Sequence, residues 1–247
     1  NLCDICENLL VFAEKNMTKK DPFSALRIPE FRWFILMRLA IVLAWSMQFV
    51  LIEWEVYRIT KDPWSLGLIG LMEVIPAIVM ALFAGHIVDQ SEKRNMLLKC
   101  FAGTATISIL FCYLVHPETA KTIGKQPFLY AIYALVFLGG IIRAFIIPSV
   151  FSLLGLIVPK TQFTNAATWS SSSWQVSAVI GPALAGFLIG GIGVFNSMIF
   201  VTISIFLGIF MLLQISKKPI LNTKIGEPIS ESLKAGIRFV FQNKIIL

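Results

Sequence analysis

The amino-acid sequence predicts an all-α membrane protein with six transmembrane helices, and three observations support this fold class. Hydrophobic residues make up 57% of the 247 residues and charged residues only 14%, whereas a soluble domain carries roughly a quarter charged residues. Six apolar runs reach the ~20 residues that a helix needs to cross a ~30 Å hydrocarbon layer. These runs are too long, and their polarity alternates too poorly, for barrel strands of ~10 residues.

The six apolar runs set the order of the expected spans along the chain. Pro63 and residues 116–127 mark outer turns, and the polar stretches 90–95 and 159–164 mark inner turns. The spans are expected at Phe34–Glu53, Ser65–Ile87, Met96–Val115, Phe128–Val150, Ala167–Ile189 and Phe195–Ile215.

Basic residues are concentrated on one side of the predicted membrane. Of the 21 lysines and arginines, 15 lie in the two ends and the inner turns, and 4 lie in the opposite loops. The remaining two, Arg38 and Arg143, lie inside spans. The positive-inside rule therefore predicts an inner-membrane or plasma-membrane protein with both ends of this chain in the cytoplasm. The net charge of +7 reflects this topology and does not indicate binding to nucleic acid.

The two ends of the chain flank the predicted six-helix bundle of residues 34–215. Residues 1–33 form a predicted cytoplasmic tail, of which 1–16 are expected not to be native because Met17 opens a more ordinary start. Cys3 and Cys6 lack the second ligand pair of a zinc site, so no metal site is predicted. Residues 216–247 form a predicted cytoplasmic linker with an amphipathic helix after Ile229. The sequence is expected to be truncated before a seventh span.

A short motif joins the second and third predicted spans. Gly85 ends the second span and permits the close approach of a neighbouring helix. Asp89 can accept hydrogen bonds from the exposed N–H groups of a neighbouring helix and pair with a basic residue. Lys93 and Arg94 then anchor the turn on the cytoplasmic side.

This turn resembles the signature loop of the major facilitator superfamily, G-x-L-x-D-R-x-G-R-K. The sequence departs from that pattern at Gln90 and Glu92, where the family usually has arginine and glycine. In transporters of this family the loop locks the inner gate in the outward-facing state. The resemblance therefore implies an inner-gate role for Asp89 and Arg94.

The resemblance extends over about residues 30–247, where the sequence is similar to the drug-exporting and siderophore-exporting branch of the family. Five further segments carry it: Trp54–Gly67, Glu73–Pro76, Arg143–Pro148, Asn165–Ala166 and Gly181–Gly186. It implies that the six helices are half of a twelve-helix major facilitator fold. A missing C-terminal six-helix half would then complete a site near the middle of the membrane.

Ionisable side chains within spans are candidate functional groups because burying them in a membrane is costly. Glu73 is a candidate proton-coupling site, and Arg143 a candidate for tuning it or for binding substrate. Glu73 lies ~12 Å and Arg143 ~22 Å from the outer face at 1.5 Å per residue, so the sequence does not require a direct bridge between them. Arg143 is instead expected to meet polar groups of the fifth span, namely Ser171, Ser172, Ser173 and Gln175.

Other polar residues near the span ends are expected to be structural. Arg38 should extend toward the inner interface, and Glu53 and Glu55 should be solvated within an outer aromatic belt. In the fifth span, Gly181 and Gly186 belong to a stripe of small residues that allows close helix contact. Pro182 permits a bend in the helix. The family resemblance implies that Gly181-Pro182 is the motif shared by exporters.

The sequence predicts a secondary active transporter, a proton-coupled exporter of a small amphipathic compound such as a drug, a siderophore or a lipid-like molecule. No enzyme activity, catalytic residue or cofactor is predicted. One alternative is the membrane domain of an ATP-driven transporter, but the turn at residues 90–95 is short and no GxxxxGK[ST] occurs. Another is an intramembrane hydrolase, but His86 and His116 lie at span ends and neither GxSxG nor HExxH occurs.

Overall fold

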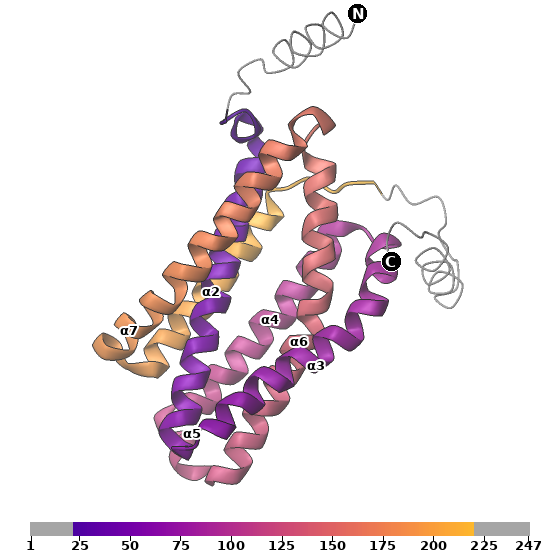
Figure 1. Cartoon of the computed structure of the whole chain (residues 1–247). Coiled ribbons are helices and arrows are strands. Elements are labelled where there is room, and N and C mark those ends of the chain that lie inside the picture. Colours follow the sequence, from indigo (N-terminus) through magenta and orange to yellow (C-terminus); the bar gives the residue numbers. More distant parts are fainter. Residues whose placement is uncertain (1–21, 220–247) are drawn as a thin grey trace, which may run out of the picture.

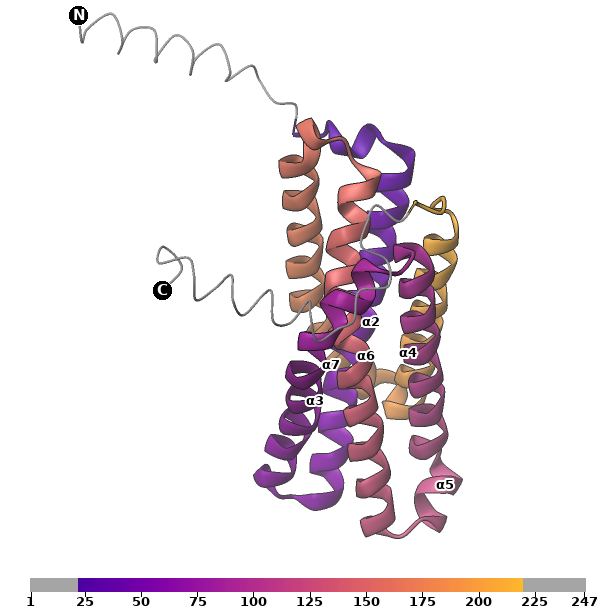
Figure 2. The same cartoon turned by 90° about the vertical axis from the view of Figure 1, so that its right-hand side faces the viewer.

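The computed structural model describes residues 22–219 as a bundle of helices, with no strand in that range (Figures 1 and 2). The sequence-based predictions for residues 1–16, for the cysteine pair near the N-terminus and for the amphipathic helix after Ile229 lie outside the described residues. The elements are η1 (Ala25–Arg27), α2 (Pro29–Thr60), α3 (Pro63–Asp89), α4 (Lys93–Val115), α5 (Pro117–Thr122), α6 (Lys125–Ile157), η2 (Lys160–Gln162) and α7 (Phe163–Leu213).

Five of these helices are long and apolar enough to cross a membrane, and the last of them contains two spans. Its 51 residues would extend ~77 Å as one straight helix, more than twice the hydrocarbon thickness. Gly193 interrupts α7 with a φ of 79°, a conformation that glycine adopts without a steric cost. Figure 1 shows the two segments of α7, in orange and yellow, running back beside each other.

Hydrogen bonds at both ends of α7 confirm that it doubles back. Asn165 near its beginning accepts a hydrogen bond from Ala25 N at 3.2 Å. Ser216 N, just beyond its end, donates to Glu30 at 3.3 Å. Both contacts lie at or just before the beginning of α2, so residues 163–192 and 194–213 are antiparallel segments. The six predicted spans are therefore present. The first five helical segments extend beyond the predicted apolar runs, whereas the sixth ends at Leu213, two residues before the predicted Ile215.

We call the end of the bundle that contains Pro29, the α3–α4 turn and Leu213 the inner end. The outer end contains the α2–α3 turn, α5 and Gly193. The sequence predicts that the inner end faces the cytoplasm.

The helix starts follow from local chemistry. Asp62 accepts a hydrogen bond from Trp64 N at 3.2 Å, with Pro63 at the first helical position of α3. Glu92 accepts from Arg94 N at 3.0 Å and from Asn95 N at 2.8 Å, and so caps α4. These contacts satisfy N–H groups that a helix itself leaves without partners.

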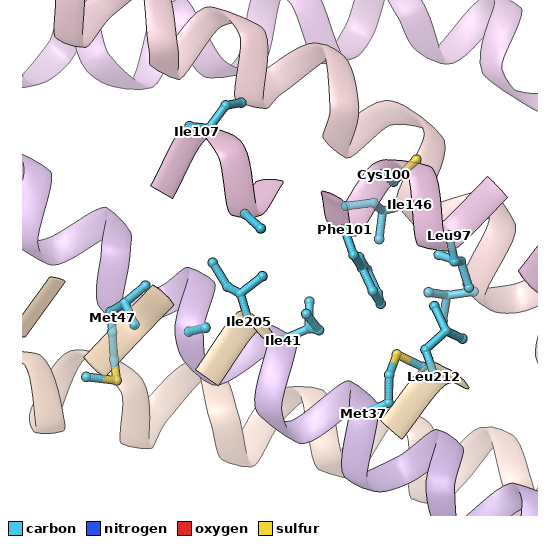
Figure 3. Packing of buried hydrophobic residues seen from close by; sticks show 14 of the residues in the cluster. Met37, Ile41, Met47, Leu97, Cys100, Phe101, Ile107, Ile146, Ile205 and Leu212 are labelled. Carbon is cyan, nitrogen blue, oxygen red and sulfur yellow. The ribbon is translucent and has the colours of Figure 1, made fainter. Parts of the chain in front are cut away.

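The core forms where α2 packs along α7 and α3 along α6, with α4 against both α6 and α7. Figure 3 shows Ile41 of α2, Phe101 of α4 and Ile205 of α7 within this packing, and all three are buried. In a membrane, tight packing of this kind and interhelical hydrogen bonds hold helices together, since lipid supplies no hydrophobic drive between them.

Candidate functional site

A cavity of about 320 Å³ opens between α2, α3, α6 and α7. Its charged lining residues are Glu73 from α3 and Arg143 from α6. Trp45 from α2 and Trp174 and Pro182 from α7 supply much of its apolar wall. A hollow lined by a few convergent charged groups among aromatic side chains is suited to binding a small amphipathic molecule.

Glu73 and Arg143 form an ion pair in this cavity, through Arg143 Nη1 and Glu73 Oε1. The Glu73 side chain is 12% exposed and that of Arg143 is 35% exposed. Their pairing offsets part of the cost of placing each charge within the membrane. The structure thus joins the two charged candidates of the sequence by a bridge that counting residues from the outer face did not require.

Trp45 completes this site. The guanidinium carbon of Arg143 lies 3.8 Å from the centre of a Trp45 ring, within the range of a cation–π interaction. Sequence reasoning did not single out Trp45. Its position in the sequence could have identified it as a site residue. Membrane tryptophans concentrate at the interfaces, whereas Trp45 lies sixteen residues into α2 from Pro29.

Gly140 sets the contact between the helices that carry the ion pair, and sequence reasoning also missed it. A Cβ atom at this position would clash with the backbone carbonyl oxygen of Glu73 and would lie 2.8 Å from Pro76 Cγ. Gly140 therefore lets α6 pack directly on α3 at Glu73. Arg143, three residues further on, lies on the same face of α6.

The polar groups of the fifth span do not pair with Arg143, contrary to the prediction. Ser171, Ser172 and Gln175 line an open groove along α7, while Ser173 donates to the Ser170 carbonyl at 2.8 Å. The misjudgement arose from matching depths along separate helices. The depth of a residue does not show which neighbouring helix its side chain points to. In the structure, Arg143 of α6 points toward α3.

Two further side chains differ from their predicted surroundings. Arg38 Nε donates to the Ser170 carbonyl of α7 at 2.9 Å, a contact with another helix that the prediction did not include. Glu55 is 2% exposed and pairs with Arg58 at 2.5 Å, so it is not solvated. The prediction missed both contacts because the distance of a side chain from a span end does not show which neighbouring group it meets.

The α3–α4 turn brings the signature residues into a set of helix-end contacts. Lys93 Nζ donates to the Val88 carbonyl, and also to the carbonyls of Asp89 and Ser91 at 3.0 Å each. Arg94 donates to the carbonyl of Leu213 at 3.0 Å. The two basic residues thus stabilise the carboxyl ends of α3 and α7, where cations are favoured.

The Asp89 carboxylate and Gly85 stand apart from these contacts. Asp89 is exposed, and within residues 22–219 its carboxylate has no hydrogen-bond partner or ion pair. The acid that caps a helix in this turn is Glu92, one of the departures from the family pattern. A Cβ at Gly85 would meet nothing within 4 Å. Both residues therefore face space that the described residues leave open.

The segment after α7 is tied to the same inner end. Lys218 Nζ pairs with Glu30 at 2.5 Å, and Lys218 N donates to Glu92 at 3.4 Å. The beginning of α2, the α3–α4 turn and the end of α7 are thereby linked through a few charged groups.

The predicted packing motif in α7 divides into two parts. At Gly181 a Cβ would lie 2.6 Å from Ser46 Cβ, so this glycine allows α7 to approach α2. One turn earlier, Ser177 donates to the Leu39 carbonyl at 3.3 Å. Gly186 has nothing within 4 Å of an added Cβ, and Pro182 lines the cavity.

These features define a multi-pass membrane protein whose helices surround a charged cavity. The chain belongs to the transmembrane secretion effector family of the major facilitator superfamily, whose family model matches residues 20–246. This match confirms the resemblance seen in the α3–α4 turn, and it favours a transporter over an enzyme.

Two curated proteins are similar to part of the chain. A staphyloferrin A transporter of Staphylococcus aureus is 25% identical over 138 residues, which are 56% of this chain and 33% of that protein. The MFS-type transporter YkuC of Bacillus subtilis is 21% identical over 142 residues, which are 58% of this chain and 31% of that protein. The chain thus spans about a third of the length of the curated relatives it matches.

Proposed function

We propose that this chain is the first six-helix half of a proton-coupled exporter that moves a small amphipathic compound by alternating access. The observation that carries the proposal is the Glu73–Arg143 ion pair, held against Trp45 in a cavity between four helices. A second six-helix half would close the cavity from the open side. Family membership and the similarity to a staphyloferrin A transporter support a drug, a siderophore or a lipid-like molecule as the cargo.

The ion pair provides a means of coupling protons to helix movement. Ionised Glu73 holds Arg143 and so joins α3 to α6. Protonation of Glu73 would remove the charge that attracts Arg143. Because both side chains are partly exposed, the pair is worth less than the ~3–5 kcal/mol lost on breaking a fully buried pair. A change of even ~1.4 kcal/mol alters the ratio of two conformations tenfold, which is enough to bias an alternating-access equilibrium.

Pro76 and Gly140 lie beside the ion pair and permit α3 and α6 to move when the ion pair breaks. Pro76 lacks the N–H that would bond within α3, which favours bending at this point. Gly140 keeps the α6 backbone against Glu73. At the inner end, Asp89 and Arg94 would belong to the inner gate, where the exposed Asp89 carboxylate is available to a helix of the second half.

The test is substrate efflux from vesicles across an imposed pH gradient, with the complete transporter. Glu73→Gln should abolish uphill efflux but retain downhill exchange, because substrate binding survives while proton linkage is lost. Glu118→Gln, the same substitution at an exposed position on α5, is the matched control and should pump normally. Uphill pumping by Glu73→Gln at the wild-type rate would show that Glu73 has only a structural role.

A further inference from the structure

A second, smaller hollow of about 50 Å³ lies next to the main cavity on its inner-end side. Trp45 and Trp174 line both hollows. The smaller one is also lined by Arg38 from α2, Phe101 from α4 and Phe151 from α6. Its wall is therefore aromatic and apolar except for a single cation.

Arg38 has no acidic partner among the described residues, which separates it from Arg143. Its Nε donates to the Ser170 carbonyl at 2.9 Å, whereas Arg143 has Glu73. A guanidinium carries five N–H donors, so this contact leaves most of them unused. A cation placed within a membrane-spanning bundle normally pairs with an acid, a carbonyl or a ligand. Arg38 lines the hollow, where an anionic group would satisfy its remaining donors.

We propose that Arg38 and the surrounding aromatic side chains form a binding subsite for the anionic group of an amphipathic molecule. The small hollow has room for a carboxylate or sulfonate group. The apolar body extends along Trp45 and Trp174 into the adjoining cavity of about 320 Å³.

The position of the subsite relative to Arg143 gives it a role in transport, and this part rests on the proposed exporter function. Arg38 and Trp45 are seven residues apart on α2, or ~10 Å along the helix. Arg143 lies over the Trp45 ring, at the outer-end side of this ~10 Å separation. An anion leaving Arg38 toward the outer end therefore meets Arg143 next. Arg143 is available to it when protonated Glu73 has released the guanidinium, so the cargo class is an amphipathic anion.

Two fluorescent probes with the same aromatic skeleton test the subsite. 1-Anilinonaphthalene-8-sulfonate carries a sulfonate, and N-phenyl-1-naphthylamine lacks it. The complete transporter is placed in nanodiscs of zwitterionic phospholipid, and binding is measured by energy transfer from tryptophan to probe. Wild type should bind the sulfonate probe more tightly than the neutral one, since hydrogen bonds to charged groups exceed neutral contacts.

Three variants assign the preference to Arg38. Arg38→Gln should weaken binding of the sulfonate probe by about tenfold or more and leave the neutral probe unchanged. Arg38→Lys keeps the charge but loses the planar fork, so it should have a smaller effect. Arg32→Gln, the same substitution at an exposed position of α2, is the matched control and should bind like wild type.

Equal affinity of the two probes for wild type, or undiminished sulfonate binding by Arg38→Gln, would overturn the proposal. If Arg38→Gln does not fold, the wild-type comparison of the two probes and the lysine variant still decide. Adding phosphatidylglycerol to the nanodiscs distinguishes the source of the anion. Competition that depends on Arg38 would support the subsite and assign its occupant to a lipid headgroup, whereas no competition would assign it to the cargo.

The outcomes also separate this inference from the proposed function. Proton-driven export of a cationic dye, with no preference for the sulfonate probe, would leave the exporter proposal standing and overturn the anion subsite. Selective sulfonate binding without proton-driven transport of any substrate would support the anion subsite and overturn the exporter proposal.

Discussion

Replacing Gly140 with alanine tests whether the ion pair depends on the contact between α6 and α3. The added Cβ would lie 2.8 Å from Pro76 Cγ and 3.1 Å from the Glu73 carbonyl carbon, and closer still to the carbonyl oxygen. Two of these three neighbours are backbone atoms, which cannot rotate away. Relief therefore requires α6 to move from α3, and Arg143 moves with it. Gly139→Ala is the matched control, because a Cβ at that position meets nothing within 4 Å.

The expected magnitude comes from two opposing effects. Alanine in place of glycine within a helix gains ~1 kcal/mol in intrinsic propensity. Overpacking a tight contact costs ~1–3 kcal/mol, and a clash with backbone should reach the upper value. Gly139→Ala should therefore be neutral or more stable by up to ~1 kcal/mol. Gly140→Ala should be less stable by ~2 kcal/mol. Because the propensity gain is common to both, their difference of ~3 kcal/mol measures the clash.

The assay is equilibrium unfolding in mixed micelles, with uphill efflux measured on the same variants. Gly140→Ala should lose stability and proton-driven efflux together, while Gly139→Ala retains both. Equal stability of the two variants would refute the reasoning, since it would mean that α6 does not approach α3 at Gly140. A stability loss in Gly140→Ala with full efflux would separate the helix contact from the coupling.

Three other predictions concern the topology, the inner gate and the cation–π contact. Single cysteines in a cysteine-free background should be labelled only from the cytoplasm at Gln90 and only from outside at Thr122; cytoplasmic labelling of Thr122 would contradict the topology. Asp89→Asn in the complete transporter should impair transport at normal membrane abundance, and unchanged transport would leave the turn with no gating role. Trp45→Leu should destabilise the Arg143 site by ~0.5–2 kcal/mol in unfolding assays, whereas Trp64→Leu, at a ring 82% exposed, should be neutral.

Local composition was enough to predict the membrane class and the spans. Each span is recognisable from about 20 consecutive apolar residues, whatever the other spans do. The turn between the fifth and sixth spans was also predictable, because the apolar run breaks near Gly193. The helix bounds were less accurate. Ends such as the extension of α6 from Lys125 to Ile157 depend on capping and on contacts outside the hydrocarbon layer.

The sequence also nominated Glu73 and Arg143, because an ionisable residue within a span needs a reason to be there. It did not predict their partnership. The residue count treated the helices as beginning at one plane, but α3 has 27 residues and α6 has 33. Moreover, helical side chains point toward the N-terminus of their helix. In α6 this direction leads from Arg143 back toward the outer end, where Gly140 holds the Glu73 backbone.

The sequence by itself determined which segments span the membrane and which charged residues the membrane makes costly, because both follow from the free energy of moving a local segment from water to lipid. Only the tertiary structure decided that Arg143 meets Glu73 and Trp45, that Arg38 has a carbonyl partner but no acid within residues 22–219, and that Gly140 is a contact point. These facts depend on which helix faces meet and at what register. Packing between segments distant in sequence sets both, and no single span encodes them.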